Sequence, residues 1–208
     1  MCGILGSISK DNLNIEKCKE SLKLLTHRGP DFSSCNVHLN SHFFIGHTRL
    51  KIIDLSNNAN QPFISNCGEY EIVFNGEIFN YKNIIKNHIN LPICRTNSDT
   101  EVVLQAFQEW GHSCLEMFNG IFAFALWDSH NKTLLLARDP QGVKPLYIAQ
   151  NNGNLAFCSE IKGLMRMFPA LTELDQDAIR RYFTFIYCPG EGTPLKGVTK
   201  LDPGSAVL

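Results

Sequence analysis

The sequence lacks any long hydrophobic run. None of its apolar segments approaches the roughly 20 residues that a membrane-spanning helix needs, and the N-terminus has neither the basic nor the long apolar segment of a signal peptide. An excess of charge of one sign is missing too, because 19 lysines and arginines stand against 20 aspartates and glutamates. Such a chain has no electrostatic reason to bind nucleic acid or an anionic membrane. We expect a cytoplasmic protein that acts on a small molecule.

Internal repeats, low-complexity tracts and recognisable linkers are also missing from the sequence. The 208 residues, 44% of them hydrophobic and 19% charged, fall in the ordinary globular range. A chain of this length can bury a full core. We therefore expect one domain that spans residues 1–208.

The eight cysteines form no C-x-x-C pair and do not cluster with histidines. This spacing predicts no metal site. Free cysteines in a reducing compartment usually serve as small buried hydrophobes, and we expect this of seven of the eight. Cys2 is the exception, because it directly follows the initiator methionine.

Helical patterns occur at five places, in segments 14–29, 80–90, 97–111, 161–167 and 176–183. Gly29-Pro30 is expected to end the first helix, and Asn80 to cap the second with its isoleucines facing inward. Ser98 and Glu101 match the S-x-x-E capping box at the start of the third.

Strand-like runs occur at 2–9, 42–54 and 70–76, followed by four short runs at 120–128, 132–139, 144–150 and 154–160. We expect these last four to form one meander of antiparallel strands, because Gly, Pro, Asn and Asp separate them. The order of these segments, with strands and helices interspersed and the later strands neighbouring in sequence, predicts an α+β fold in which helices cover antiparallel sheets.

Cys2 is a candidate nucleophile. Removal of Met1 would free its α-amine, whose pKa of ~7.7–8.0 is well matched to the ~8.5 of a thiol and suits a general base near neutral pH. Cys2 is small enough for Met1 to be removed, and Gly3 would let a substrate approach closely. A chance cysteine at the start of a strand is the alternative interpretation.

Asn75 and Gly76 are candidates for an oxyanion hole. The Asn75 amide and the Gly76 N–H can both point at one developing negative charge, and Glu77 adds a carboxylate beside them. An Asn-Gly pair after a strand is also ordinary hairpin-turn chemistry. The residues alone leave both interpretations open.

Eight segments in order resemble the glutaminase domain of class II glutamine amidotransferases, and more narrowly its asparagine synthetase branch. They are MCGILG, HRGPD at 27–31, GHTRLKIIDLS at 46–56, QPF at 61–63, FNGEIFNY at 74–81, RTNSDTEVVL at 95–104, FNGIFAFALWD at 118–128 and ARDPQGVKPLY at 137–147. The later YFTFIYCPGEGTPLKGVTKLDPG extends the resemblance to about residue 208. Amidophosphoribosyltransferases and glutamine–fructose-6-phosphate enzymes share the start and the Asn-Gly step, but HRGPD with PGEGT fits asparagine synthetase better.

The resemblance implies an N-terminal nucleophile hydrolase fold, a four-layer αββα sandwich of two antiparallel sheets flanked by helices. It implies that Cys2 is the nucleophile and that Asn75 and the Gly76 N–H form the oxyanion hole. No cofactor or metal is implied for this domain.

For substrate binding, the resemblance implies that Arg49 grips the α-carboxylate of glutamine, a bidentate task that suits a guanidinium. Glu77 and Asp99 would accept the α-ammonium, and backbone groups of Leu50, Ile52 and Ile53 would line the same pocket. Without the resemblance, Arg49 could be a solvated charge at a strand edge, and Asp99 an acid favoured in the first turn of a helix. We expect structural roles for His27, Arg28, Asp31, Asp139 and Lys144.

The sequence departs from asparagine synthetases in having no S-G-G-x-D-S pyrophosphate loop. The ATP-dependent synthetase domain, with its ATP and magnesium, is therefore expected to be absent, whether the chain is an excised domain or a subunit of a split enzyme. The expected reaction is hydrolysis of L-glutamine to L-glutamate and ammonia through a Cys2 thioester. The ammonia would pass to a synthetase domain or subunit that converts aspartate to asparagine. Another acceptor, such as an acidic sugar or a cell-surface precursor, and a catalytically silent binding module are the alternatives, and a homodimer is possible.

Overall fold

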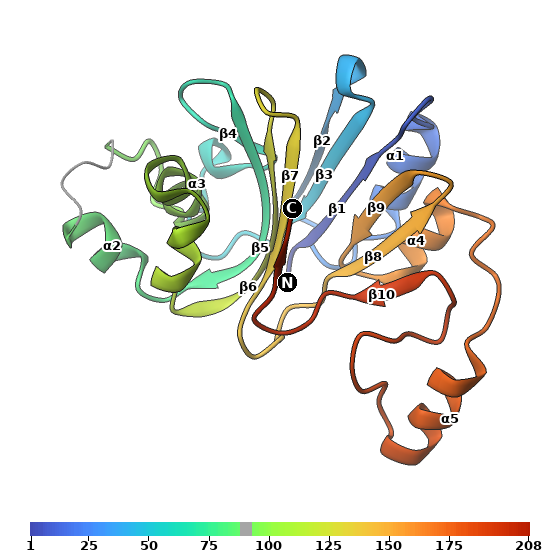
Figure 1. The fold of residues 1–208 in the computed structure, drawn as a ribbon. Coiled ribbons are helices and arrows are strands. Elements are labelled where there is room, and N and C mark those ends of the chain that lie inside the picture. Colours follow the sequence, from blue (N-terminus) through green and yellow to red (C-terminus); the bar gives the residue numbers. More distant parts are fainter. Residues whose placement is uncertain (88–92) are drawn as a thin grey trace.

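The computed structural model describes residues 1–87 and 93–208. Within these residues, the strands form two sheets packed face to face (Figure 1). The six-stranded sheet has the order β10-β8-β9-β1-β3-β2 and the five-stranded sheet the order β11-β7-β6-β5-β4, with neighbours antiparallel. The bounds in the first sheet are β1 Gly3–Ile8, β2 Phe32–His38, β3 Phe43–Arg49, β8 Tyr147–Asn151, β9 Asn154–Cys158 and β10 Val198–Lys200. Those in the second are β4 Phe63–Ile64, β5 Tyr70–Ile78, β6 Gly120–Asp128, β7 Thr133–Arg138 and β11 Ala206–Val207.

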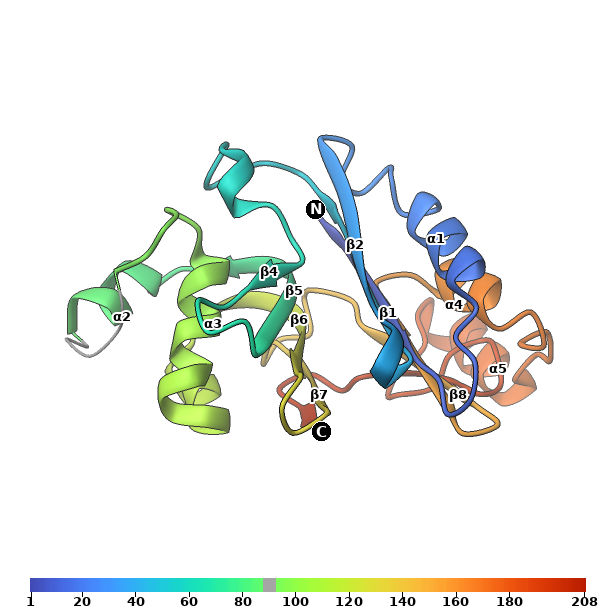
Figure 2. The same ribbon diagram turned by 90° about the horizontal axis from the view of Figure 1, so that it is seen from above.

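Helices cover the outer face of each sheet. The helices α1, Ile15–Lys23, and α4, Ile161–Met167, lie against the six-stranded sheet, whereas α3, Asp99–Trp110, lies against the five-stranded sheet with α2, Tyr81–Asn87, beside it (Figures 1 and 2). The helix α5, Gln176–Phe185, projects from the body of the molecule (Figure 1). Short 3₁₀ helices span Leu39–Ser41, Asn57–Ala59 and Gly111–Met117. These layers confirm the expected αββα sandwich.

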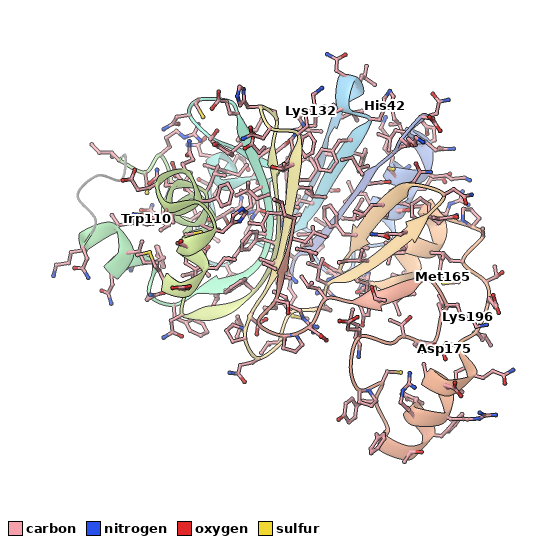
Figure 3. The ribbon with its side chains drawn as sticks, viewed as in Figure 1. His42, Trp110, Lys132, Met165, Asp175 and Lys196 are labelled. Atoms are coloured by element: carbon pink, nitrogen blue, oxygen red, sulfur yellow. The ribbon has the colours of Figure 1, made fainter. Side chains whose placement is uncertain are left out.

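Apolar side chains fill the layer between the sheets (Figure 3). Phe43 of β3 and Trp127 of β6 stack across this layer with their ring centroids 4.5 Å apart. Two further clusters fill the outer layers, one under α3 and one under α1 and α4. Burial of this apolar surface on both faces of each sheet is the main force that holds the four layers together.

The expected single meander of four strands is wrong. The strands β6 and β7 pair in the five-stranded sheet, and β8 and β9 pair in the other sheet. The chain crosses between the sheets after Arg138, where the Asp139 carboxylate accepts hydrogen bonds from the backbone N–H groups of Gln141, Val143 and Lys144. Asp139 therefore has the structural role in a turn that the sequence predicts.

The predicted helix starts are only partly correct. The Ser98 hydroxyl accepts a hydrogen bond from the Thr100 N–H, but Glu101 turns back to the N–H groups of Arg95 and Thr96 instead of completing the capping box. Asn80 does not cap α2 through its side chain, which bonds with Met117 and Asn119.

The predicted helix ends also differ in places. The helix at 161–167 has the expected bounds, and α5 runs two residues beyond 183. The helix α1 ends at Lys23, well before Gly29. In the predicted helix 80–90, residues 88–90 lie outside the described part of the chain, Ile84 is buried and Ile85 is 38% exposed.

All eight cysteines are free thiols, but the expectation that seven are buried is wrong for four of them. Cys18, Cys114 and Cys158 are buried, Cys35, Cys94 and Cys188 are half-buried, and Cys67 is exposed. The described residues include no helix of the length and apolar character that a bilayer crossing requires.

Candidate functional site

One cavity of about 180 Å³ brings together all nine residues that the sequence analysis selects for the site. These residues are Cys2, Arg49, Leu50, Ile52, Ile53, Asn75, Gly76, Glu77 and Asp99. They come from the residue before β1, the end of β3 and the loop after it, the second half of β5 and the start of α3. The volume lies below the roughly 300–1,000 Å³ of pockets for drug-sized ligands, so the cavity suits a molecule about as small as an amino acid.

Cys2 lies just before β1, at the end of the chain that enters between the two sheets (Figure 1). The Leu50 N–H donates to its Sγ at 3.4 Å, and the thiol lies 3.7 Å from the Leu50 carbonyl oxygen. Burial raises the pKa of the Cys2 thiol, while the Leu50 N–H and the charges of the N-terminus, Arg49 and Arg28 act in the opposite direction. Burial therefore favours the protonated thiol, while the nearby positive charges favour the thiolate.

Arg28 anchors the backbone of Cys2, a contact that the sequence analysis missed. Its Nε donates to the Cys2 carbonyl oxygen at 2.9 Å, and its Nη1 lies 2.9 Å from the carboxylate of Glu160. Burial works to raise the pKa of Glu160, but hydrogen bonds from Arg28, Lys162 and His27 outweigh it and hold that pKa at about 2. The carboxylate therefore stays charged and keeps Arg28 in place.

Asn75 and Gly76 lie inside β5, where they pair with Ala123 and Phe122 of β6, so the interpretation as a hairpin turn is wrong. A Cβ atom at Gly76 would lie 2.2 Å from the carbonyl oxygen of Ile121 and 2.6 Å from the Cα of Phe122. Glycine is therefore required by the close approach of the neighbouring strand. Asn75 is 1% exposed, and its Nδ2 has no hydrogen-bond partner among the described residues.

The Gly76 N–H faces the open edge of β5. Alternate residues of a strand direct their backbone groups to the same edge, and the Phe74 and Ile78 N–H groups on this edge donate to the side chains of Gln61 and Asp99. The short strand β4 pairs with β5 only at Ile72 and Glu71. Gly76 lies between Phe74 and Ile78 on this edge and lines the cavity, so its N–H points into the cavity.

Arg49 is 5% exposed, so the interpretation as a solvated charge is wrong. Its Nη1 donates to the Ser56 carbonyl oxygen and the Asn60 Oδ1, both at 2.7 Å, and its Nη2 donates to the Asp54 carbonyl oxygen. The Asp54 carboxylate accepts the Asn97 N–H at 2.9 Å, which ties this loop to the start of α3. Asp54 was not among the predicted site residues, although this acid lies in the same segment, 46–56, as Arg49.

Asp99 is buried at the first residue of α3, and its Oδ2 accepts the Ile78 N–H at 2.9 Å. Burial, with a smaller effect of the nearby Glu77 charge, raises the pKa of Asp99 to about 6. Glu77 and Asp99 thus line the same cavity, together with Asp54. Ile52 and Ile53 are 60% and 36% exposed and lie at the rim.

Several residues of the cavity wall were absent from the predicted set. They are Met1, Asp54, Ala59, Gln61, Phe74, Ser98, Thr100, Ile121 and Lys144. Lys144 was expected to have a structural role, and its backbone N–H does bond with Asp139 in a turn. Gln61 belongs to the QPF segment that carried part of the resemblance, so the sequence held a signal for it.

Comparison with known proteins gives consistent results. A family model described as a glutamine amidotransferase domain matches residues 1–208. "Asparagine synthetase [glutamine-hydrolyzing] 1" of Bacillus subtilis (strain 168) is 35% identical over 211 residues, which cover 99% of this chain and 33% of that protein. "Putative asparagine synthetase [glutamine-hydrolyzing] 2" of Methanocaldococcus jannaschii is 32% identical over 222 residues, which cover 97% of this chain and 42% of that protein. The chain thus spans between a third and a half of these relatives.

The fold also has solved counterparts. The glutamine phosphoribosylpyrophosphate amidotransferase from B. subtilis, in complex with ADP and GMP, matches with a TM-score of 0.67 and 22% sequence identity. The match covers 80% of this chain and 43% of that one. At this identity the likeness establishes the fold alone, a sandwich of two antiparallel sheets between helices.

Proposed function

The chain belongs to the family of glutamine amidotransferase domains, which are enzyme domains, and we propose that it hydrolyses L-glutamine to L-glutamate and ammonia in the cavity at Cys2. One observation carries this proposal: a thiol, an amide without a hydrogen-bond partner, a backbone N–H at an open strand edge and buried charged groups all line one small cavity. Acyl transfer requires a nucleophile and preorganised donors for the oxyanion in this arrangement.

In the proposed reaction, the α-amine of Cys2, once Met1 is removed, accepts the thiol proton. The thiolate attacks the side-chain amide carbon of glutamine, and the carbonyl oxygen takes the negative charge while Asn75 Nδ2 and the Gly76 N–H donate to it. The intermediate collapses to a γ-glutamyl thioester as ammonia leaves with the proton from the α-ammonium. Water then attacks the thioester and releases glutamate and the Cys2 thiol.

The surroundings of Cys2 support the α-amine as the base. No histidine occurs among the described residues that line the cavity. His47 lies in β3 two residues before Arg49, but burial lowers its pKa to about 3. A base that is so weak would take up very little proton near neutral pH.

The amino-acid end of glutamine is proposed to lie between Arg49 and the acids Glu77 and Asp99. A guanidinium has five N–H donors, and three bonds from Arg49 go to the loop of Asp54, Ser56 and Asn60. Donors therefore remain for the α-carboxylate, and the loop bonds fix the plane of the guanidinium in advance. Backbone groups of Leu50, Ile52 and Ile53 complete this part of the pocket.

We further propose that residues 1–208 form one glutaminase domain without a cofactor of its own. Its ammonia would serve an ATP-dependent synthetase domain or subunit that converts aspartate to asparagine in the cytoplasm, and ATP and magnesium would bind there. The names and the greater length of the relatives support this extension.

The test compares two preparations, one with Met1 removed and one in which an uncleaved residue precedes Cys2. Intact mass defines each N-terminus, and ammonia release from glutamine measures activity. We expect activity only in the first, because a peptide nitrogen cannot accept the thiol proton. Full activity in the second would overturn the mechanism.

Labelling distinguishes activation from mere accessibility. Cys67 is exposed and Cys2 is half-buried, so a general thiol reagent such as iodoacetamide should label Cys67 readily. A glutamine-shaped diazoketone should alkylate Cys2 instead, and a Cys67→Ser variant should keep full activity. Equal alkylation of both cysteines by the diazoketone would contradict a glutamine site at Cys2.

A further inference from the structure

The second half of β5 runs along an edge that has no neighbouring strand in the described part of the chain beyond Ile72. Both backbone groups of Phe74 on this edge are nevertheless bonded. The Phe74 N–H donates to Gln61 Oε1 at 2.6 Å, and His47 Nε2 donates to the Phe74 carbonyl oxygen at 3.2 Å. Two side chains thus do for Phe74 what a partner strand does elsewhere in the sheet.

These bonds are fully enclosed. Gln61 is 5% exposed, Phe74 2% and His47 0%. A buried backbone group without a partner is strongly unfavourable, so Phe74 is held where Gln61 and His47 can reach it. The next two residues are Asn75 and Gly76, so any shift at Phe74 moves both oxyanion donors.

Gln61 also connects this strand to the helix that carries Asp99. Its Nε2 donates to Oγ1 of Thr100 at 3.1 Å, and Thr100 directly follows Asp99 in the chain. Asp99 in turn accepts the Ile78 N–H at 2.9 Å. The start of α3 is therefore attached to β5 on both sides of the Asn75–Glu77 segment.

We propose that Gln61 is a positioning residue, which fixes the backbone of Phe74 and thereby aims the Asn75 amide and the Gly76 N–H at the reacting carbonyl oxygen. This inference rests on the proposed glutaminase function. Gln61 acts through Phe74, and its contribution falls on the transition state more than on the binding of glutamine, because charge develops on that oxygen only during the reaction.

The variant Gln61→Met has a side chain of similar length that cannot bond with Phe74 or Thr100. We expect kcat to fall roughly 10-fold to 100-fold, as for a small misplacement of reacting groups, with KM changed less than about threefold. Gln61→Glu keeps two oxygen acceptors, one for the Phe74 N–H and one for the Thr100 hydroxyl, so its kcat should lie between those of Gln61→Met and the parent, because the buried carboxylate opposes the negative charge of the oxyanion.

Gln105→Met is the matched control. Gln105 is also a buried glutamine, 4% exposed, but it lies in the middle of α3, and its Oε1 accepts a hydrogen bond from the Cys94 thiol. It does not line the cavity. The control should keep kcat within about twofold of the parent, because its change leaves the β5 edge untouched. An equal fall of kcat in Gln61→Met and Gln105→Met would show that Gln61 contributes only to packing and would overturn the proposal.

A measurement that does not depend on turnover separates this proposal from the proposed function. In ¹H–¹⁵N spectra, the Gly76 backbone and Asn75 side-chain resonances should move in Gln61→Met and stay in place in Gln105→Met. A parent protein without ammonia release would refute the glutaminase function, while the spectra would still decide whether Gln61 positions these groups. Unmoved resonances, or a Gln61→Met variant with the kcat of the parent, would refute the positioning role.

Discussion

The unpartnered amide of Asn75 leads to the most discriminating prediction. A buried polar group without a hydrogen bond destabilises the folded state by about 1–3 kcal/mol, and Asn75 Nδ2 is such a group among the described residues. If this donor is kept for the oxyanion, Asn75→Ala should remove both a cost to stability and a contribution to catalysis. The two effects have opposite signs, which a purely structural asparagine would not show.

The expected magnitudes follow from the contacts. Asn75→Ala removes the unpaired amide, so the free energy of unfolding should stay unchanged or rise by up to about 2 kcal/mol. For a chain of this size, each kcal/mol corresponds to about 2–4 °C in Tm. The kcat for glutamine should fall by roughly 10²–10³, as it does when one preorganised oxyanion donor is lost.

Asn80→Ala provides the control on the same strand-to-helix segment. Asn80 Nδ2 donates to the Met117 carbonyl oxygen at 2.8 Å, and its Oδ1 accepts the Asn119 N–H at 2.9 Å. Loss of these two bonds should lower stability by about 1–3 kcal/mol, with little change in kcat. Thermal unfolding and ammonia release are measured on both variants. A loss of stability in Asn75→Ala as large as in Asn80→Ala, or a kcat within twofold of the parent, would refute the reasoning.

Two further predictions concern the amino-acid end of glutamine. Arg49→Lys should raise the KM for glutamine about 10-fold to 100-fold, because one ammonium cannot keep the loop bonds and also grip a carboxylate in bidentate fashion; steady-state kinetics with an unchanged KM would remove Arg49 from the site. Burial raises the pKa of Asp99 to about 6 from the 3.8 of an ordinary aspartate, so its negative charge is lost as the pH falls through about 6. The KM should therefore rise below pH 6, and Asp99→Asn should abolish this dependence. Folding favours the protonated form, so the contribution of Asp99 to stability should decline as the pH rises from about 4 to about 6, and thermal unfolding of Asp99→Asn against pH should lack this decline.

The local pattern of the sequence was sufficient for most helices and for the first strand. The helix at 161–167 has the predicted bounds, and the strand predicted at 2–9 is observed at Gly3–Ile8. Apolar spacing and capping residues decide such elements within a few residues of chain, so they can be recognised without a partner. The strand β2, Phe32–His38, was missed, because it lies at the edge of its sheet and has no buried residue to mark its period.

The sequence by itself also determined the candidate site residues, although mainly through the resemblance to a family. From the residues alone, Cys2 and Asn75-Gly76 suggested a nucleophile and an oxyanion hole, but each of them, like Arg49, also allowed an ordinary structural interpretation. All nine selected residues line one cavity, but the chemical role of each remains a prediction.

Only the tertiary structure decided how distant segments meet. It placed Asn75-Gly76 in the middle of a strand instead of a turn, because β6 pairs across both residues and leaves no room for a Cβ at Gly76. It separated β7 from β8 into different sheets, and it brought Gln61 to the open edge of β5. Local periodicity reports which face of a segment is buried, but the segment that buries it depends on the packing of the whole chain.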